Sequence, residues 1–151
     1  MFSFAFGSDR IIGDSFGPIV GTKLKKLFEP MKNVYIIGDL ENTVNNNNAN
    51  NIINEICDKH NNPFIISIDS AFSNTSTNVG KIVVGKGGIW LGQSLGREKY
   101  IIGDMNIKGI VAKNMHNMRK NMYLLQNASL GQIAHMAEIV ANGIYCSIDC
   151  E

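Results

Sequence analysis

Long apolar runs and cysteines are scarce in this sequence. No apolar stretch approaches the ~20 residues that a transmembrane helix needs, so no membrane partner is expected. The first residues, MFSFAFGSDR, have no basic segment before their short apolar stretch, which is unlike a signal peptide. The three cysteines are an odd number, and unpaired thiols are typical of the reducing cytosol. We therefore expect a cytoplasmic protein.

An excess of charge is also missing, because 14 Lys and Arg residues are balanced by 13 Asp and Glu residues. The basic residues are scattered, apart from Lys23, Lys25 and Lys26 on a predicted amphipathic helix, where a solvated helix face explains them. Nucleic-acid-binding domains usually concentrate Lys and Arg on one surface. We therefore expect no nucleic-acid partner.

The end of the sequence comes closest to a metal-binding motif. Cys146 and Cys150 lie near each other with Asp149 and Glu151 beside them, but no further Cys or His follows at the spacing of a zinc site. We interpret residues 146–151 as a short C-terminal tail. Residues 1–145 are interpreted as a single α/β domain, because about 150 residues fit one domain.

Among the histidines, His116 follows a predicted strand and is the one best placed to act as a ligand.

Apolar segments alternate with amphipathic ones along the first half of the chain. Short apolar runs predict strands at residues 2–6, 33–38 and 63–68. Helical spacing of apolar residues predicts helices over residues 17–30 and 52–60, the second after an asparagine-rich loop at 45–51. Strands that alternate with helices form right-handed crossovers and parallel sheets. The sequence therefore predicts a three-layer α/β/α fold with a mainly parallel sheet between the helices.

The second half of the chain predicts two more strands, at residues 81–84 and 106–111. The glycine-rich stretch 85–103 contains the only tryptophan and is predicted to be a long surface loop. One final helix is predicted from about residue 118 or 121 to residue 141, with Gly143 beyond its end.

Two aspartates follow predicted strands in the sequence. Asp14 lies in the loop that follows the first strand, and Asp69 comes directly after the third. Ligands of parallel sheets bind beyond the carboxyl ends of the strands, so we expect Asp14 and Asp69 to converge on one crevice. Neighbouring carboxylates raise one pKa, which allows the pair to act as acid and base or to share a divalent metal ion. No cofactor is predicted. The sequence is compatible with a divalent metal ion at Asp14 and Asp69 and also with a metal-free pair.

Residues beside the two aspartates are predicted to support the site, namely Asp9, Arg10, Ser15 and Ser70. The acidic residues also have structural interpretations. Asp14 precedes a predicted helix, where Asp is a favoured N-cap, and Asp69 can accept hydrogen bonds from loop amides. Asp9 and Arg10 can form a surface ion pair. The motifs GxSxG, GxGxxG and GxxxxGK[ST] are absent, so neither a serine nucleophile elbow nor a phosphate loop is predicted.

The loop that carries Asp14 also resembles a known family. Residues 7–10 and 13–24, read as GSDR and GDSFGPIVGTKL, closely resemble the opening signature of YyaC-type sporulation proteins. Further segments at 66–71, 78–80, 103–111, 125–127 and 136–138 occur in the order of that family. The resemblance therefore covers nearly the whole chain.

The resemblance implies a fold and a chemistry. YyaC-type proteins resemble the spore germination protease and, more remotely, the peptidases that mature hydrogenases. This implies a phosphorylase/hydrolase-like three-layer fold and active-site carboxylates at Asp14 and Asp69. Two departures stand out, because Asn45 occupies a position where the family usually has His, and residues 87–92 replace a loop rich in Pro and Gly.

The resemblance favours a peptidase that acts on a peptide or spore protein in a spore or sporulating cell. The alternative is a non-catalytic binding or regulatory protein that keeps the peptidase-like fold, because a fold does not establish an activity. A nucleoside-phosphorylase-like transferase shares the broad architecture, but the sequence lacks the basic phosphate site that such a reaction requires.

Overall fold

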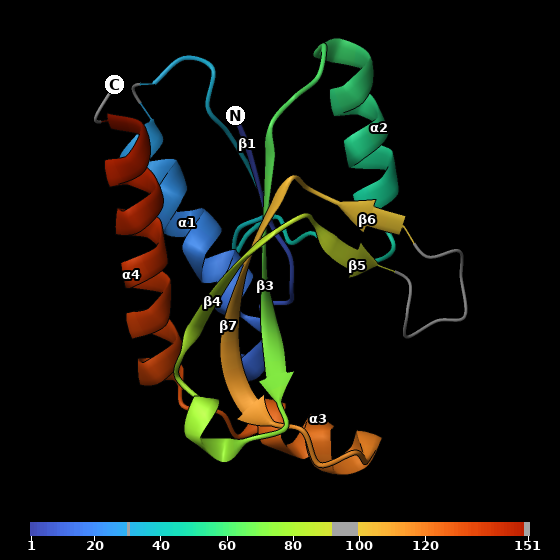
Figure 1. Cartoon of the computed structure of the whole chain (residues 1–151), viewed down its shortest axis with the longest axis vertical. Helices are drawn as coiled ribbons and strands as arrows, with labels where there is room; N and C mark the ends of the chain where they lie inside the picture. Colours follow the sequence, from blue (N-terminus) through green and yellow to red (C-terminus); the bar gives the residue numbers. More distant parts are fainter. Residues whose placement is uncertain (30, 92–99, 150–151) are drawn as a thin grey trace.

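The structure is a computed structural model that describes residues 1–29, 31–91 and 100–149. A five-stranded sheet with the order β2-β1-β3-β7-β4 lies at its centre (Figure 1). The parallel strands are β1 (Phe2–Ala5), β2 (Tyr35–Ile37), β3 (Ile65–Ser73) and β7 (Met105–Lys113). β4 (Ile82–Lys86) runs antiparallel beside β7. The predicted α/β class with a mainly parallel sheet is confirmed.

Both faces of the sheet are covered (Figure 1). One face carries α1 (Phe16–Phe28) and α4 (Leu130–Asp149). The other carries α2 (Ala49–Lys59) and a small hairpin of β5 (Ile89–Leu91) and β6 (Tyr100–Ile102). α3 (Met118–Gln126) lies at the carboxyl ends of β3 and β7. Among the described helices, none is long and apolar enough to cross a membrane.

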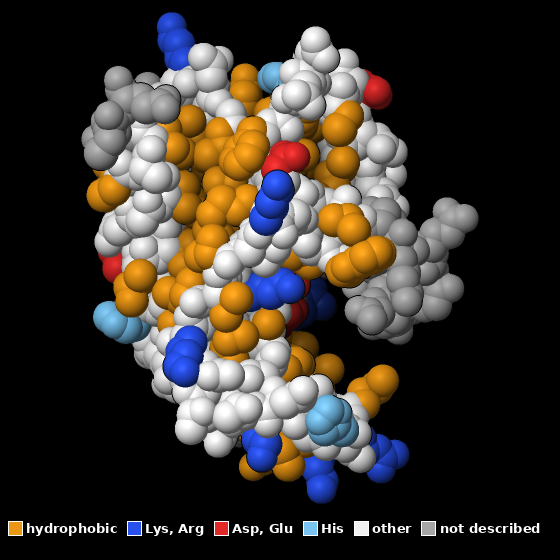
Figure 2. Space-filling model, in the orientation of Figure 1, with side chains coloured by type: hydrophobic (Ala, Val, Ile, Leu, Met, Phe, Trp, Pro, Cys, Tyr) orange, Lys and Arg blue, Asp and Glu red, His pale blue; other side chains and the backbone are white. Residues whose placement is uncertain are grey.

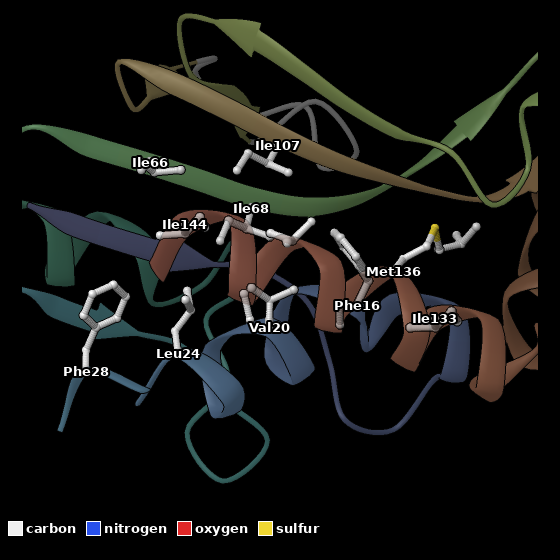
Figure 3. Packing of buried hydrophobic residues seen from close by; sticks show 14 of the residues in the cluster. Phe16, Val20, Leu24, Phe28, Ile66, Ile68, Ile107, Ile133, Met136 and Ile144 are labelled. Carbon is white, nitrogen blue, oxygen red and sulfur yellow. The ribbon is translucent and has the colours of Figure 1, made fainter. Parts of the chain in front are cut away.

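Alternation along the strands gives each face its own core. On one face, Ile66 and Ile68 of β3 and Ile107 of β7 meet the apolar side chains of α1 and α4 (Figure 3). On the other face, Phe2 and Phe4 of β1 pack with α2 and the hairpin. Each large apolar side chain that is fully buried contributes roughly 1.5–3 kcal/mol, so both layers stabilise the sheet.

The prediction of one final helix that stops before Gly143 is wrong. The side-chain amide of Asn127 donates to the carbonyl of Tyr123, and the Ser129 hydroxyl accepts from the N–H of Gln132, so these polar groups separate α3 from α4. α4 then continues through Gly143 to Asp149 because Ile144 is buried in the core. Residues 146–149 of the predicted tail therefore belong to α4, and residues 150–151 lie outside the described residues.

The prediction of a surface loop over residues 85–103 is also wrong for the residues that the structure describes. β4 extends to Lys86, and the β5–β6 hairpin follows it. Ile89 and Ile102 pair across the hairpin and are buried in the core beside α2. Residues 92–99 of the predicted loop lie outside the described residues.

Replacing Gly143 by Ala tests whether α4 continues past this residue. A Cβ atom at Gly143 would have no neighbour within 4 Å, and Ala is favoured over Gly inside a helix. We expect the Gly143→Ala variant to raise the free energy of unfolding by ~0.5–1 kcal/mol, measured by urea denaturation. The control is Gly21→Ala, which should destabilise the protein, because its Cβ would lie 1.9 Å from the carbonyl oxygen of Gly38. Destabilisation by Gly143→Ala would indicate that the helix ends near this residue.

Candidate carboxylate site

The site opens where β1 leaves the sheet. β1 pairs with β3 as far as Ala5 and Ile68, and the N–H of Phe6 donates to the carbonyl of Ile68 at 2.8 Å. β3 itself continues to Ser73, paired with β7. Asp69 is thus the first residue of β3 beyond its pairing with β1, and it does not follow the end of its strand as the sequence predicted. The crevice exists because β1 ends early and β3 does not.

A tight turn places Asp14 beside this opening. Asp14 ends a short 3-10 helix, Ile12–Asp14, directly before α1. Its carbonyl oxygen accepts a hydrogen bond from the N–H of Ser8 at 3.0 Å. Gly7 has a φ of 139°, and a Cβ atom there would lie 2.1 Å from the same carbonyl oxygen. Glycine at residue 7 therefore lets the chain return to the end of β1 with Asp14 next to it.

Asp14 and Asp69 line one cavity of about 140 Å³. The other residues around it come from the end of β1 and from the loop after β2, namely Phe6, Gly7, Ser8, Val44, Asn45 and Asn46. A water molecule occupies ~30 Å³ in the liquid, so the cavity has room for a few waters or a small part of a substrate. Figure 2 shows the surface hollowed between the β5–β6 hairpin and α3.

The two carboxyl groups have raised pKa values. Burial raises the pKa of Asp69 to about 7, helped by the negative charge of Asp14 and opposed by the N–H of Ser70 and by Lys108. Burial also raises the pKa of Asp14, against the effect of the Ser70 hydroxyl, which lies 3.5 Å from its Oδ1. Close carboxylates resist double ionisation, so at neutral pH the pair tends to keep a proton.

The structure tests the two structural interpretations of Asp14 and Asp69. The N-cap residue of α1 is Ser15, and no side chain caps this helix, so the interpretation of Asp14 as an N-cap is wrong. Asp69 accepts a hydrogen bond from the N–H of Ser70, its neighbour within β3, at 2.8 Å. Its carboxylate therefore accepts a hydrogen bond from an amide of its own strand, and not from the loop amides that the structural interpretation named.

The predicted supporting residues divide into two groups. Ser70 lies at the site, where its hydroxyl approaches Asp14. The hydroxyl of Ser15 is buried and donates to the carbonyl of Ile12 at 2.6 Å, which closes the 3-10 helix. Asp9 and Arg10 are exposed and do not line the cavity. Among the residues that the structure describes, no ion pair joins Asp9 to Arg10.

Sequence reasoning missed Lys108, which contributes a positive charge to the site. Lys108 pairs in register with Asp69 across β3 and β7, and its charge acts on the Asp69 carboxylate. Strand alternation places Lys108 on the same sheet face as Asp69, but the register between two distant strands cannot be read from their sequences. His116, the histidine considered as a ligand, is exposed and does not line the cavity.

The cavity offers oxygen donors to a cation. These are the carboxylates of Asp14 and Asp69. The side-chain oxygen of Asn45, which also lines the cavity, accepts a hydrogen bond from the N–H of Asn47. Such donors are typical of Mg²⁺, Ca²⁺ and Mn²⁺, whereas nickel and zinc sites usually include His or Cys. Within the described parts of the chain, no group of three or more His, Cys, Asp or Glu side chains gathers around a common point.

Comparison with known proteins gives a family without an assigned activity. The family model "Protein of unknown function (DUF1256)" matches residues 2–143. The "Uncharacterized protein YyaC" of Bacillus subtilis (strain 168) is 33% identical over 138 residues, which are 91% of this chain and 64% of that protein. The chain thus spans about 64% of the length of this relative. No solved structure matches this chain significantly.

Replacing Asp69 by Asn tests the electrostatic cost of the pair. The folded pKa of Asp69 is about 7, above the ordinary 3.8, so the folded protein binds more protons between these values and loses stability as the pH rises through them. We expect the Asp69→Asn variant to have a higher free energy of unfolding than wild type at pH 8, by ~1–2 kcal/mol, and a smaller advantage at pH 5. Urea denaturation at both pH values measures this.

The control for this prediction is Asp58→Asn, which removes one exposed carboxylate from α2. It should change the stability little at either pH. If Asp69→Asn loses ~2 kcal/mol or more at both pH values, Asp69 is a structural hydrogen-bond partner and the electrostatic interpretation is wrong.

Proposed function

This chain belongs to the DUF1256 family, whose description assigns no activity. From the geometry of its site, we propose that it hydrolyses peptide bonds. The observation that carries the proposal is the carboxylate pair. Asp14 and Asp69 line one cavity at the carboxyl edge of a parallel sheet, and burial raises the pKa of both. Paired carboxyl groups that share a proton are suited to general acid–base hydrolysis.

The environments of the two carboxyl groups support different roles for them. Burial raises the pKa of Asp14 and the Ser70 hydroxyl opposes this rise, and we assign Asp14 the role of general base. Burial favours the protonated form of Asp69 at neutral pH, which makes Asp69 the general acid. Lys108 offsets part of the negative charge of the pair. The site can thus hold one proton and one negative charge next to a bound peptide.

The reaction then proceeds without a covalent bond between the enzyme and the substrate. Asp14 takes a proton from a water molecule, and the water oxygen forms a bond to the carbonyl carbon of the substrate. Asp69 gives its proton to the amide nitrogen as the carbon–nitrogen bond breaks, and the products are a carboxylic acid and an amine. A divalent cation bound by the carboxylates of Asp14 and Asp69 would polarise the same carbonyl group.

Asn45 is suited to stabilise the developing negative charge on the carbonyl oxygen. Its side-chain oxygen accepts a hydrogen bond from the N–H of Asn47 at 2.9 Å, which fixes the orientation of the amide. The amide NH₂ group is then the donor that can face a substrate. Asn45 thereby supplies a neutral donor at the position where the resembled family usually has His.

The proposed substrate is a polypeptide of the spore or sporulating cell. This part of the proposal rests on the resemblance of residues 7–24 to YyaC-type sporulation proteins. A binding or regulatory protein with the same fold is the second candidate, favoured by Asn45 in place of His, and the experiment below separates the two.

The Asp14→Asn and Asp69→Asn variants test the proposed hydrolysis. Wild type and variants are incubated with spore extract, with and without a chelator, and new peptide termini are identified by mass spectrometry. We expect each variant to lose at least ~100-fold in cleavage rate, because general acid–base catalysis contributes about that much. The double variant should be scarcely worse than either single variant, because the two groups act as a unit. A loss of cleavage with the chelator alone would add a metal to the mechanism.

The control is again Asp58→Asn, whose cleavage products should match those of wild type. Identical products from wild type and the double variant would exclude catalysis by these carboxylates. An intact partner that co-purifies with both proteins would then support the binding candidate.

The pH dependence of cleavage gives a separate test. Asp69 must be protonated to donate to the leaving amine, and its pKa is about 7. We therefore expect the cleavage rate of wild type to fall as the pH rises above about 7, by about tenfold per pH unit. A rate that stays constant well into the alkaline range would contradict the role of Asp69 as general acid.

A further inference from the structure

α3 presents an unusual group of exposed apolar side chains. None of its residues is fully buried. Met115, just before the helix, and Met118, Met122 and Tyr123 within it are 41%, 84%, 41% and 64% exposed. Single exposed apolar residues are common, but several around one short helix form a patch of the kind that marks interaction sites. Methionine is frequent at surfaces that bind peptides, because its flexible side chain adapts to a partner.

Part of this patch is concave. A cavity of about 370 Å³ is lined by Met115, Arg119, Lys120, Tyr123 and Leu124, which we call the α3 surface. Its apolar residues can surround a side chain of a partner, while Arg119 and Lys120 place two positive charges at the same cavity. The shape suits an inserted side chain better than a flat or convex partner such as a lipid surface.

The segment of sequence that contains α3 carries positive side chains and no negative ones. Between Asp104 and Glu138 the sequence contains no Asp or Glu, although it carries Lys108, Lys113, Arg119 and Lys120. Of these four residues, Arg119 and Lys120 line the cavity of the α3 surface, so the charge at this cavity favours an acidic partner.

Hydrogen bonds hold the α3 surface in place. The side chain of Asn121 accepts from the N–H of Met115 at 2.8 Å and donates to the side chain of Asn114 at 3.0 Å. Asn117 caps α3 by accepting from the N–H of Lys120 at 3.1 Å. A surface that is already ordered loses less entropy when a partner binds.

The α3 surface is also connected to the carboxylate site. A Cβ atom at Gly13 would lie 2.8 Å from the Cα atom of Leu125, so α3 packs directly on the turn that ends in Asp14. Figure 2 shows the hollow of the molecular surface next to α3. The helix that carries the α3 surface and the turn that carries Asp14 are therefore in direct contact.

We propose that the α3 surface docks an acidic segment of the polypeptide substrate, with one apolar side chain of that segment between Met115 and Tyr123 and its carboxylates on Arg119 and Lys120. The inference rests on the proposed function in naming the docked polypeptide as the substrate. The docking itself needs no cleavage. The surface thus selects substrates by a segment outside the scissile bond.

Binding is measured with the full chain carrying both Asp14→Asn and Asp69→Asn, so that no probe is cut. The probe is a short fluorescent peptide of Glu residues around a central Leu, followed by fluorescence anisotropy at low salt. We expect it to bind, and the same peptide with Ser for Leu or with Lys for Glu to bind at least about tenfold more weakly. Arg119→Glu and Tyr123→Ser should each weaken binding of the Glu–Leu peptide by a similar factor.

The matched control is Lys26→Glu, which makes the same kind of charge change on the exposed side of α1 and should leave binding unchanged. Equal weakening by Lys26→Glu and Arg119→Glu would overturn the proposal, because binding would then follow net charge alone. So would stronger binding of anionic vesicles or of a single-stranded oligonucleotide than of the peptide.

Cleavage assays distinguish failure of the docking from failure of the proposed hydrolysis. In a chain with intact carboxylates, Arg119→Glu should raise the KM for a cleaved acidic substrate and leave kcat unchanged. Peptide binding without any cleavage by wild type would support the docking and reject the hydrolysis. Cleavage that Arg119→Glu does not affect would reject the docking and keep the hydrolysis.

Discussion

β1 leaves the sheet after Ala5 because α1 begins directly against it: a Cβ atom at Gly17 would lie 2.0 Å from the carbonyl oxygen of Phe6. That contact turns the chain away from β3, whose next residue is Asp69. It also fixes the short turn in which Asp14 stands. The cavity, the convergence of the two carboxyl groups and their raised pKa values all depend on this close approach of helix and strand.

The carboxylate pair is unfavourable for folding, since burial and mutual repulsion oppose its ionised form. The rest of the domain offsets this cost through two separate cores, one beneath α1 and α4 and one beneath α2 and the hairpin. A rigid sheet between these cores can hold two repelling groups side by side. Unfavourable groups that are held at the carboxyl ends of the strands of a well-packed sheet are typical of functional sites.

α3 contacts the turn of the carboxylate site and also exposes apolar side chains. It packs on the turn of Asp14 through Leu125, yet leaves its methionines and Tyr123 exposed. In our proposal, the chemistry of the carboxylates and the recognition of a partner lie on different elements that contact each other. This arrangement allows specificity to change on α3 while the geometry of the carboxyl groups stays fixed.

Local patterns in the sequence determined the class of the fold, the strands of the first half and the choice of Asp14 and Asp69, because apolar periodicity and strand ends are local features. Tertiary structure decided the rest. Burial of Ile144 carried α4 past Gly143, and pairing of Ile89 with Ile102 made a hairpin where glycines indicated a loop. Pairing with β7 placed Asp69 inside its strand and Lys108 beside it. These outcomes depend on contacts between residues far apart in the chain, whose free energies exceed the local preferences of the residues concerned.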